Sequence, residues 1–135
     1  MTLLLVLLGA LLGACSGSDG SDDLCVQVSA ECVPLYAPTF QNIFDNTLMP
    51  GCGVPGSACH AVEGAQGGLI LSDIDTAYEA LVTEGGRIDS DMLGCGTLLS
   101  RVATDTASLL MPPGAPLADS EICAITQWVA AGAPR

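Results

Sequence analysis

The sequence contains no lysine and only three arginines, against fifteen acidic residues, so the 135-residue chain has a formal net charge of −12. Proteins that bind nucleic acid or anionic lipid headgroups need clustered basic side chains to neutralise phosphate. The composition therefore excludes a nucleic-acid-binding protein and a peripheral protein held to a membrane by charge alone. The acids themselves are interpreted mainly as a solvated surface.

Aromatic residues are also scarce, because the chain has one Trp, two Tyr and two Phe. A small core with so few aromatics favours disulfide bonds or a large cofactor as additional filling. Motifs for a nucleophile elbow, a phosphate-binding loop or a calcium loop are absent from the sequence. His60 is the only histidine, so any histidine-dependent site must use it.

The N-terminal segment Met1–Ala14 is apolar but too short to span a bilayer as a helix. It ends in small residues directly before Cys15 and resembles the lipobox of bacterial lipoproteins, which implies cleavage before Cys15 and lipidation of that cysteine. An ordinary secretory signal followed by a free cysteine is the alternative. The polar stretch 16–23 is typical of a flexible tether. Since Ser16 after the cysteine resembles an outer-membrane signal, we expect an exported protein anchored there, facing the periplasm or the cell surface.

The expected organisation is a signal peptide over residues 1–14, a tether and cysteine-containing lead-in over 15–37, and one domain over 38–135. With Cys15 assigned to lipid, six cysteines remain, and an even number in an exported chain is typical of disulfides, with fifteen possible pairings. The simplest pairs are a local Cys25–Cys32 loop and a Cys95–Cys123 bridge between a turn and the last helix.

Apolar residues recur at helical spacing in the mature chain, and no segment has a convincing strand pattern. Four helical stretches are expected, with Phe40 and Phe44 on the first placed to cross Trp128 on the last. Thr39 should cap the first, and Ser72 with Asp75 should form a capping box for the second. The stretches run from Thr39 to Pro50-Gly51, from Ser72 to Gly85-Gly86, from Asp91 to Val102, and from Asp119 to Ala131. The fold class is therefore all-α, with long Gly/Pro-rich loops and disulfide staples.

The strongest chemical signal is the pair Cys59-His60, preceded by Cys52. The attachment signature of c-type haem is C-x-x-C-H, in which two thiols hold the ring and the adjacent imidazole reaches the iron. Here six residues separate the cysteines instead of two. That insert is rich in Gly and Pro, and can bulge outward while both thiols stay near the ring.

Further residues carry a resemblance to the small class I cytochrome c-like domains of planctomycete and myxobacterial exported proteins. Besides Phe40, Phe44 and Cys52…Cys59-His60, they are Gly67-Gly68-Leu69, Tyr78…Leu81, Met111-Pro112-Pro113-Gly114, Glu121-Ile122 and Trp128…Gly132-Ala133-Pro134. Their order covers nearly the whole chain after Thr39. The resemblance implies covalent haem c on Cys52 and Cys59, with His60 and Met111 as axial ligands of the iron, and an electron carrier rather than an enzyme.

Two alternatives to covalent haem remain open. A haem-free surface lipoprotein would keep the helices as a binding or structural module, with Cys52–Cys59 as a third disulfide. A zinc site from Cys52, Cys59, His60 and Cys95 has suitable ligand types but matches no zinc module. The acidic surface, finally, has a functional interpretation: it would speed docking to a basic redox protein.

Overall fold

The computed structural model describes residues 25–135, so the signal-like segment, Cys15 and the tether lie outside the described residues. The described part is helical and contains no β-strand, which confirms the all-α prediction at that level. Within residues 25–135, no helix is both long and apolar enough to cross a membrane. The elements in chain order are α1 (Phe40–Ile43), η2 (Phe44–Leu48), α2 (Met49–Gly51), η3 (Gln66–Gly68), α3 (Ile74–Tyr78), η4 (Glu79–Thr83), η5 (Leu93–Cys95), α4 (Thr97–Val102) and α5 (Asp119–Ala130).

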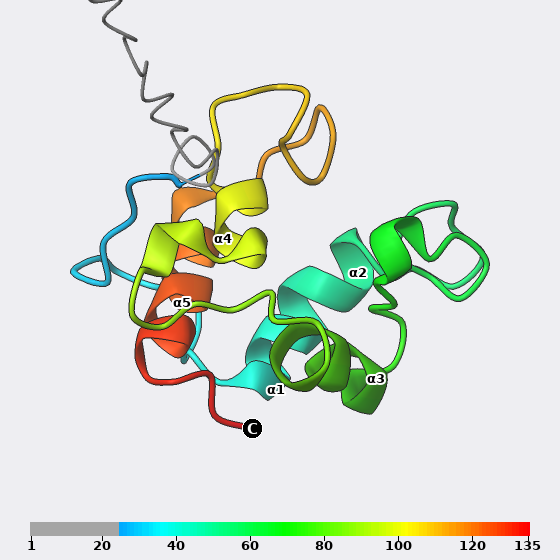
Figure 1. Ribbon diagram of the computed structural model, residues 1–135, viewed down its shortest axis with the longest axis horizontal. Coiled ribbons are helices and arrows are strands. Elements are labelled where there is room, and N and C mark those ends of the chain that lie inside the picture. The colour runs from blue at the N-terminus through cyan, green and yellow to red at the C-terminus, as the bar shows by residue number, and fades with distance from the viewer. Residues whose placement is uncertain (1–24) are drawn as a thin grey trace, which may run out of the picture.

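The first expected helix is formed by α1, η2 and α2, which follow one another without a break (Figure 1). As predicted, Thr39 is its N-cap and accepts a hydrogen bond from the Asn42 N–H at 3.3 Å. The middle element, η2, is a π-helix, and a second π-helix, η4, continues α3. Such wide turns are common at functional sites, and each of these two contributes one leucine, Leu48 or Leu81, to the cavity described below.

The cap of the second helix differs by one residue from the prediction. Asp73, rather than Ser72, is the N-cap: its Oδ1 accepts hydrogen bonds from the Thr76 N–H at 3.0 Å and the Thr76 hydroxyl at 2.9 Å. The Asp73 carboxylate caps the helix in place of the Ser72–Asp75 capping box because it accepts both hydrogen bonds from a single residue, Thr76. An anion is also favoured at a helix N-terminus.

The third expected helix, from Asp91 to Val102, is divided into η5 and α4. Gly96 separates them in an extended conformation, with φ −61° and ψ 138°. Gly94, on the other side of Cys95, packs against the lead-in, where a side-chain Cβ would lie 1.7 Å from the carbonyl oxygen of Val26. The break therefore lets the lead-in backbone approach this turn closely, and the Val26 N–H donates to the Gly94 carbonyl at 3.0 Å.

The predicted crossing of the first and last helices is confirmed by an aromatic cluster in the core. Phe40 lies with its ring centroid 5.2 Å from that of Trp128, 5.0 Å from Tyr78 and 6.3 Å from Phe44. Trp128 is fully buried, and its Nε1–H donates to the Pro134 carbonyl at 2.8 Å, so the C-terminal residues fold back onto α5. These rings pack together within a core that is otherwise mainly aliphatic.

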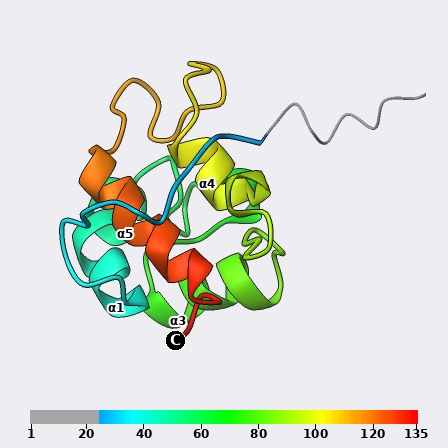
Figure 2. The ribbon, with the colours of Figure 1, turned by 90° about the vertical axis from the view of Figure 1, so that its left-hand side faces the viewer.

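The four structural cysteines are all paired, but the pairing predicted from the sequence is wrong. The bridges are Cys25–Cys95 and Cys32–Cys123, not Cys25–Cys32 and Cys95–Cys123. The reason is the path of the lead-in, which runs extended across α5 instead of closing a local loop (Figure 2). Each bridge therefore joins the lead-in to a different part of the body.

Hydrogen bonds follow the same path. The Gln127 side-chain amide on α5 donates to the carbonyls of Ala30 and Cys32, both at 3.0 Å. The Leu35 N–H donates to the Ser120 carbonyl at 2.9 Å. Residues 25–26 are thus held against η5, and residues 30–35 along α5, by both covalent and polar contacts.

Candidate functional site

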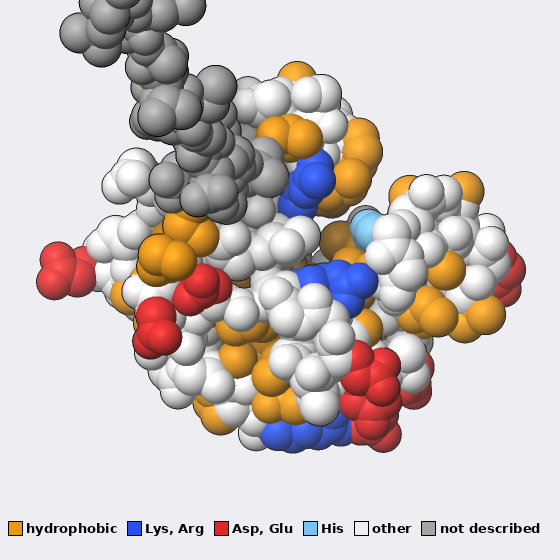
Figure 3. Space-filling model, in the orientation of Figure 1, with side chains coloured by type: hydrophobic (Ala, Val, Ile, Leu, Met, Phe, Trp, Pro, Cys, Tyr) orange, Lys and Arg blue, Asp and Glu red, His pale blue; other side chains and the backbone are white. Residues whose placement is uncertain are grey.

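A cavity of about 430 Å³ lies between the loop that follows α2 and the segment formed by α4 and Met111. Its size falls within the usual range for cofactor and small-molecule sites, about 300–1,000 Å³. The walls are mainly apolar, with lining residues that include Leu48, Leu69, Leu71, Leu81, Leu98 and Val102. Figure 3 shows a hollow on this face, with the histidine and basic side chains near it.

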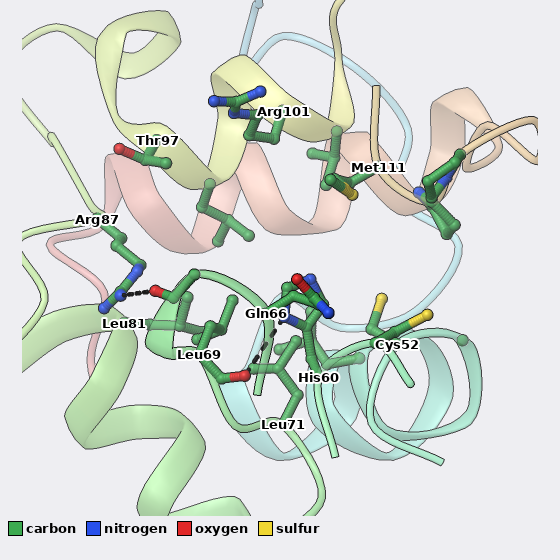
Figure 4. Close-up of a pocket in the computed structure, with 18 residues that line it drawn as sticks. Cys52, His60, Gln66, Leu69, Leu71, Leu81, Arg87, Thr97, Arg101 and Met111 are labelled. Atoms are coloured by element: carbon green, nitrogen blue, oxygen red, sulfur yellow. Dashed lines mark hydrogen bonds between the residues drawn. The ribbon is translucent and has the colours of Figure 1, made fainter. Parts of the chain in front are cut away.

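Cys52, Cys59, His60 and Met111 all line this one cavity. Three of them come from the loop after α2, while Met111 comes from a segment about fifty residues further along the chain. In Figure 4, Cys52 and His60 lie on the lower side of the cavity and Met111 on the upper side. The fold therefore brings together the whole set of side chains that sequence analysis singled out.

Backbone hydrogen bonds hold the cysteine loop in shape. The His60 N–H donates to the Cys52 carbonyl at 3.2 Å, which closes the loop between the two cysteines, and the Leu71 N–H donates to the His60 carbonyl at 2.7 Å. Gly53 packs so tightly that a Cβ there would lie 2.1 Å from the Leu71 carbonyl oxygen. Residues 54–56 and 58 of the loop are exposed, in line with its Gly/Pro content, while both cysteines still line the cavity.

The ring of His60 is oriented by one hydrogen bond. Its Nδ1 lies 3.3 Å from the Leu69 carbonyl oxygen (Figure 4). Because a carbonyl oxygen only accepts, Nδ1 must carry the hydrogen, which leaves the lone pair on Nε2. Histidines that bind metals are commonly oriented in this way by a carbonyl on the other ring nitrogen. The half-buried imidazole is thus prepared to act as a ligand through Nε2.

Met111 is also half-buried, and its N–H donates to the Arg101 carbonyl at 2.9 Å. This bond ties the Met-Pro-Pro segment to α4. A thioether is a soft, uncharged ligand that suits iron in an electron-transfer site. The other methionine near this part of the chain, Met92, is 60% exposed and does not line the cavity.

The two remaining cysteines differ in environment. Cys59 is exposed, whereas Cys52 is half-buried, and burial together with nearby Cys59 and Glu121 raises the pKa of the Cys52 thiol to about 11. Cys52 is therefore a neutral thiol at pH 7. Both thiols are free, so the Cys52–Cys59 disulfide expected for a haem-free protein is not formed.

The zinc alternative is contradicted. Cys95, one of its four proposed ligands, is consumed by the bridge to Cys25. Among the residues that the structure describes, no group of three or more His, Cys, Asp and Glu side chains is arranged to hold a metal ion.

Two further residues of this site, Arg87 and Arg101, were not predicted from the sequence. Both line the cavity and both are half-buried. Neither belongs to a motif, and the only signal available was that arginine is rare in this chain, with three in total.

In comparisons with protein-family models, curated proteins and solved structures, nothing matched this chain. The functional conclusion therefore depends on the residues of the cavity themselves.

Proposed function

We propose that the chain is a c-type cytochrome that transfers electrons and carries one covalently attached haem. The observation that carries this proposal is that Cys52, Cys59, His60 and Met111 line one apolar cavity. The donor set fits the cofactor: two free thiols, an imidazole with its Nε2 available and a thioether from a different segment. The resemblance in sequence to class I cytochrome c-like domains supports the same proposal.

Each residue has a defined part in this proposal. Cys52 and Cys59 would hold the ring through thioether bonds, which prevent loss of the cofactor outside the cell. His60 would bind the iron through Nε2 while Leu69 fixes its ring plane, and Met111 would bind from the opposite side. When bound, haem supplies a one-electron Fe(III)/Fe(II) couple.

The same arrangement favours an electron carrier over an enzyme. If His60 and Met111 both bind the iron, no position would be left for a substrate. The leucine walls would shield a bound ring from water, and the exposed Cys59 on the cysteine loop would leave a route for an electron to pass to a partner. We propose a basic redox protein as that partner, because the chain carries fifteen acids.

The location proposed for the protein depends on its N-terminal sequence. Lipid on Cys15, as implied by the lipobox-like segment, would anchor the chain to the outer membrane, and residues 16–23 would let the domain stand away from it. The disulfides of the described domain are compatible with export to an oxidising compartment.

Substitution of the two axial ligands tests the proposal. Protein from a host that attaches haem c should show a six-coordinate, low-spin ferric spectrum. We expect His60→Ala to abolish the reversible redox signal and Met111→Ala to convert the ferric spectrum to a high-spin form. Met92→Ala is the matched control, because Met92 is exposed and lies away from the cavity.

An unchanged ferric spectrum in Met111→Ala would show that Met111 is not a ligand. A redox signal of unchanged potential and an unchanged ferric spectrum in His60→Ala would overturn the proposed site as a whole, since the chain has no other histidine.

A further inference from the structure

Arg87 and Arg101 are basic residues without acidic partners at the edge of an apolar cavity. The Arg87 guanidinium donates to the carbonyls of Ala80 and Gly67, the latter at 3.1 Å. Arg101 has a single long contact, 3.5 Å to the Leu109 carbonyl. The one ion pair found among residues 25–135 joins the third arginine, Arg135, to Asp75.

This distribution is unexpected for the composition. The chain has fifteen acids and three arginines, so carboxylates are abundant, yet the two cavity arginines are satisfied only by backbone carbonyls. A guanidinium keeps its charge at every physiological pH and offers five N–H donors. Placing such a charge against apolar walls is costly unless an anion compensates it. The site therefore has unused capacity for anionic groups.

The positions of the two arginines relative to Cys52 indicate how a ligand would be oriented in the cavity. In Figure 4, Arg87 lies on the left of the cavity and Arg101 above it on α4, whereas Cys52 lies on the right, away from both arginines. A ligand that fits this arrangement is flat and apolar in the middle, reacts with thiols at one edge and bears acidic groups at the opposite edge. In protoporphyrin the two vinyl groups and the two propionates lie on opposite edges of the ring.

We propose that Arg87 and Arg101 bind the two carboxylates of the cavity ligand, which under the proposed function are the haem propionates, and so fix the orientation of the ring. This inference rests on the proposed function. Because six residues rather than two separate Cys52 and Cys59, the two thiols alone would fix the orientation of the ring less strictly. The arginines would place the ring before the thiols react, so that the vinyl edge faces the cysteine loop.

The test compares two probes that differ only in their acidic groups, hemin and hemin dimethyl ester, each dispersed in the same mild detergent. The full-length chain, prepared without haem and with Cys52 and Cys59 reduced, is titrated with each probe, and binding is followed by quenching of the single tryptophan, Trp128. Wild-type protein should bind the diacid more tightly than the ester, by about tenfold for each carboxylate–arginine contact.

Variants assign the preference to the arginines. Arg87→Gln and Arg101→Gln should each weaken hemin binding about tenfold while leaving the affinity for the ester nearly unchanged. Arg135→Gln is the matched control and should alter neither affinity, because Arg135 pairs with Asp75 away from the cavity. The lysine variants Arg87→Lys and Arg101→Lys keep the charge and should retain most of the preference.

The outcomes separate this inference from the proposed function. Equal affinity of wild-type protein for both probes would overturn the role of the arginines and leave haem binding standing. If the lysine variants lose the preference as fully as the glutamine variants, the arginines act through their backbone contacts, and the inference is wrong. Failure of both probes to bind wild-type protein would overturn the proposed function together with the inference.

Discussion

The Cys32–Cys123 bridge should provide a large part of the stability of this domain. It joins the lead-in to α5 across a sequence separation of 91 residues. The chain-entropy relation for a closed loop of that length gives about 4.6 kcal/mol at 25 °C. Because the Cys25–Cys95 bridge already restricts part of the same unfolded chain, we expect the double variant Cys32→Ser/Cys123→Ala to lose about 3–4 kcal/mol. Typical domains have only about 5–15 kcal/mol in total, so the variant should be close to unfolding.

The assay is unfolding in guanidinium chloride under non-reducing conditions, after peptide mapping of the bridges in wild-type protein. The matched control is Cys25→Ser/Cys95→Ser, which opens a loop with a separation of 70 residues. Its predicted entropic cost differs by only about 0.2 kcal/mol, so the two variants should lose similar stability, apart from the burial of Cys123. A loss below about 1 kcal/mol in the Cys32–Cys123 variant would refute this reasoning. Mapping of Cys95 to Cys123 would contradict the path of the lead-in itself.

Two further substitutions test the packing of the cysteine loop and the cap of α3. Gly53→Ala should destabilise the protein by about 1–3 kcal/mol in thermal unfolding, because its Cβ would meet the Leu71 carbonyl, whereas Gly51→Ala, with nothing within 4 Å, should be tolerated. The Thr76 N–H and hydroxyl bonds lower the pKa of Asp73, so its contribution to stability is present above the unfolded-state pKa and is lost as the pH falls through the lower folded-state value. Asp73→Ala should therefore lower the melting temperature at pH 7, and the difference should shrink as the solution becomes strongly acidic; a difference independent of pH would contradict the cap.

Local patterns in the sequence predicted the helices well. Thr39 caps the first, the apolar stripe through Phe40 and Phe44 is buried, and α5 ends at Ala130, just before Gly132, which has φ +88°. These features depend on residues within one or two turns of each other, which is why periodicity and capping chemistry could find them. The π-helical turns were not foreseen, since nothing in the local pattern separates them from ordinary helix.

Features that depend on distant contacts were harder to predict. The four structural cysteines were identified correctly, but their pairing follows from the route of the lead-in across α5, which no local signal specifies. The same holds for Arg87 in the loop after η4 and Arg101 in α4, which both line the cavity although no local pattern links them. By contrast, Cys52, Cys59 and His60 are near neighbours in a recognisable pattern, so the sequence could place them together.

The most direct test of the central claim is an absorption spectrum of the protein from its native host, before and after reduction with dithionite, followed by acid–acetone extraction. If Cys52 and Cys59 hold haem, the protein should show a Soret band and sharp bands on reduction, and this colour should stay with the protein through extraction. The variant Cys52→Ser/Cys59→Ser should release its haem under the same treatment. A colourless native protein whose intact mass shows Cys52 and Cys59 joined in a disulfide would contradict the account.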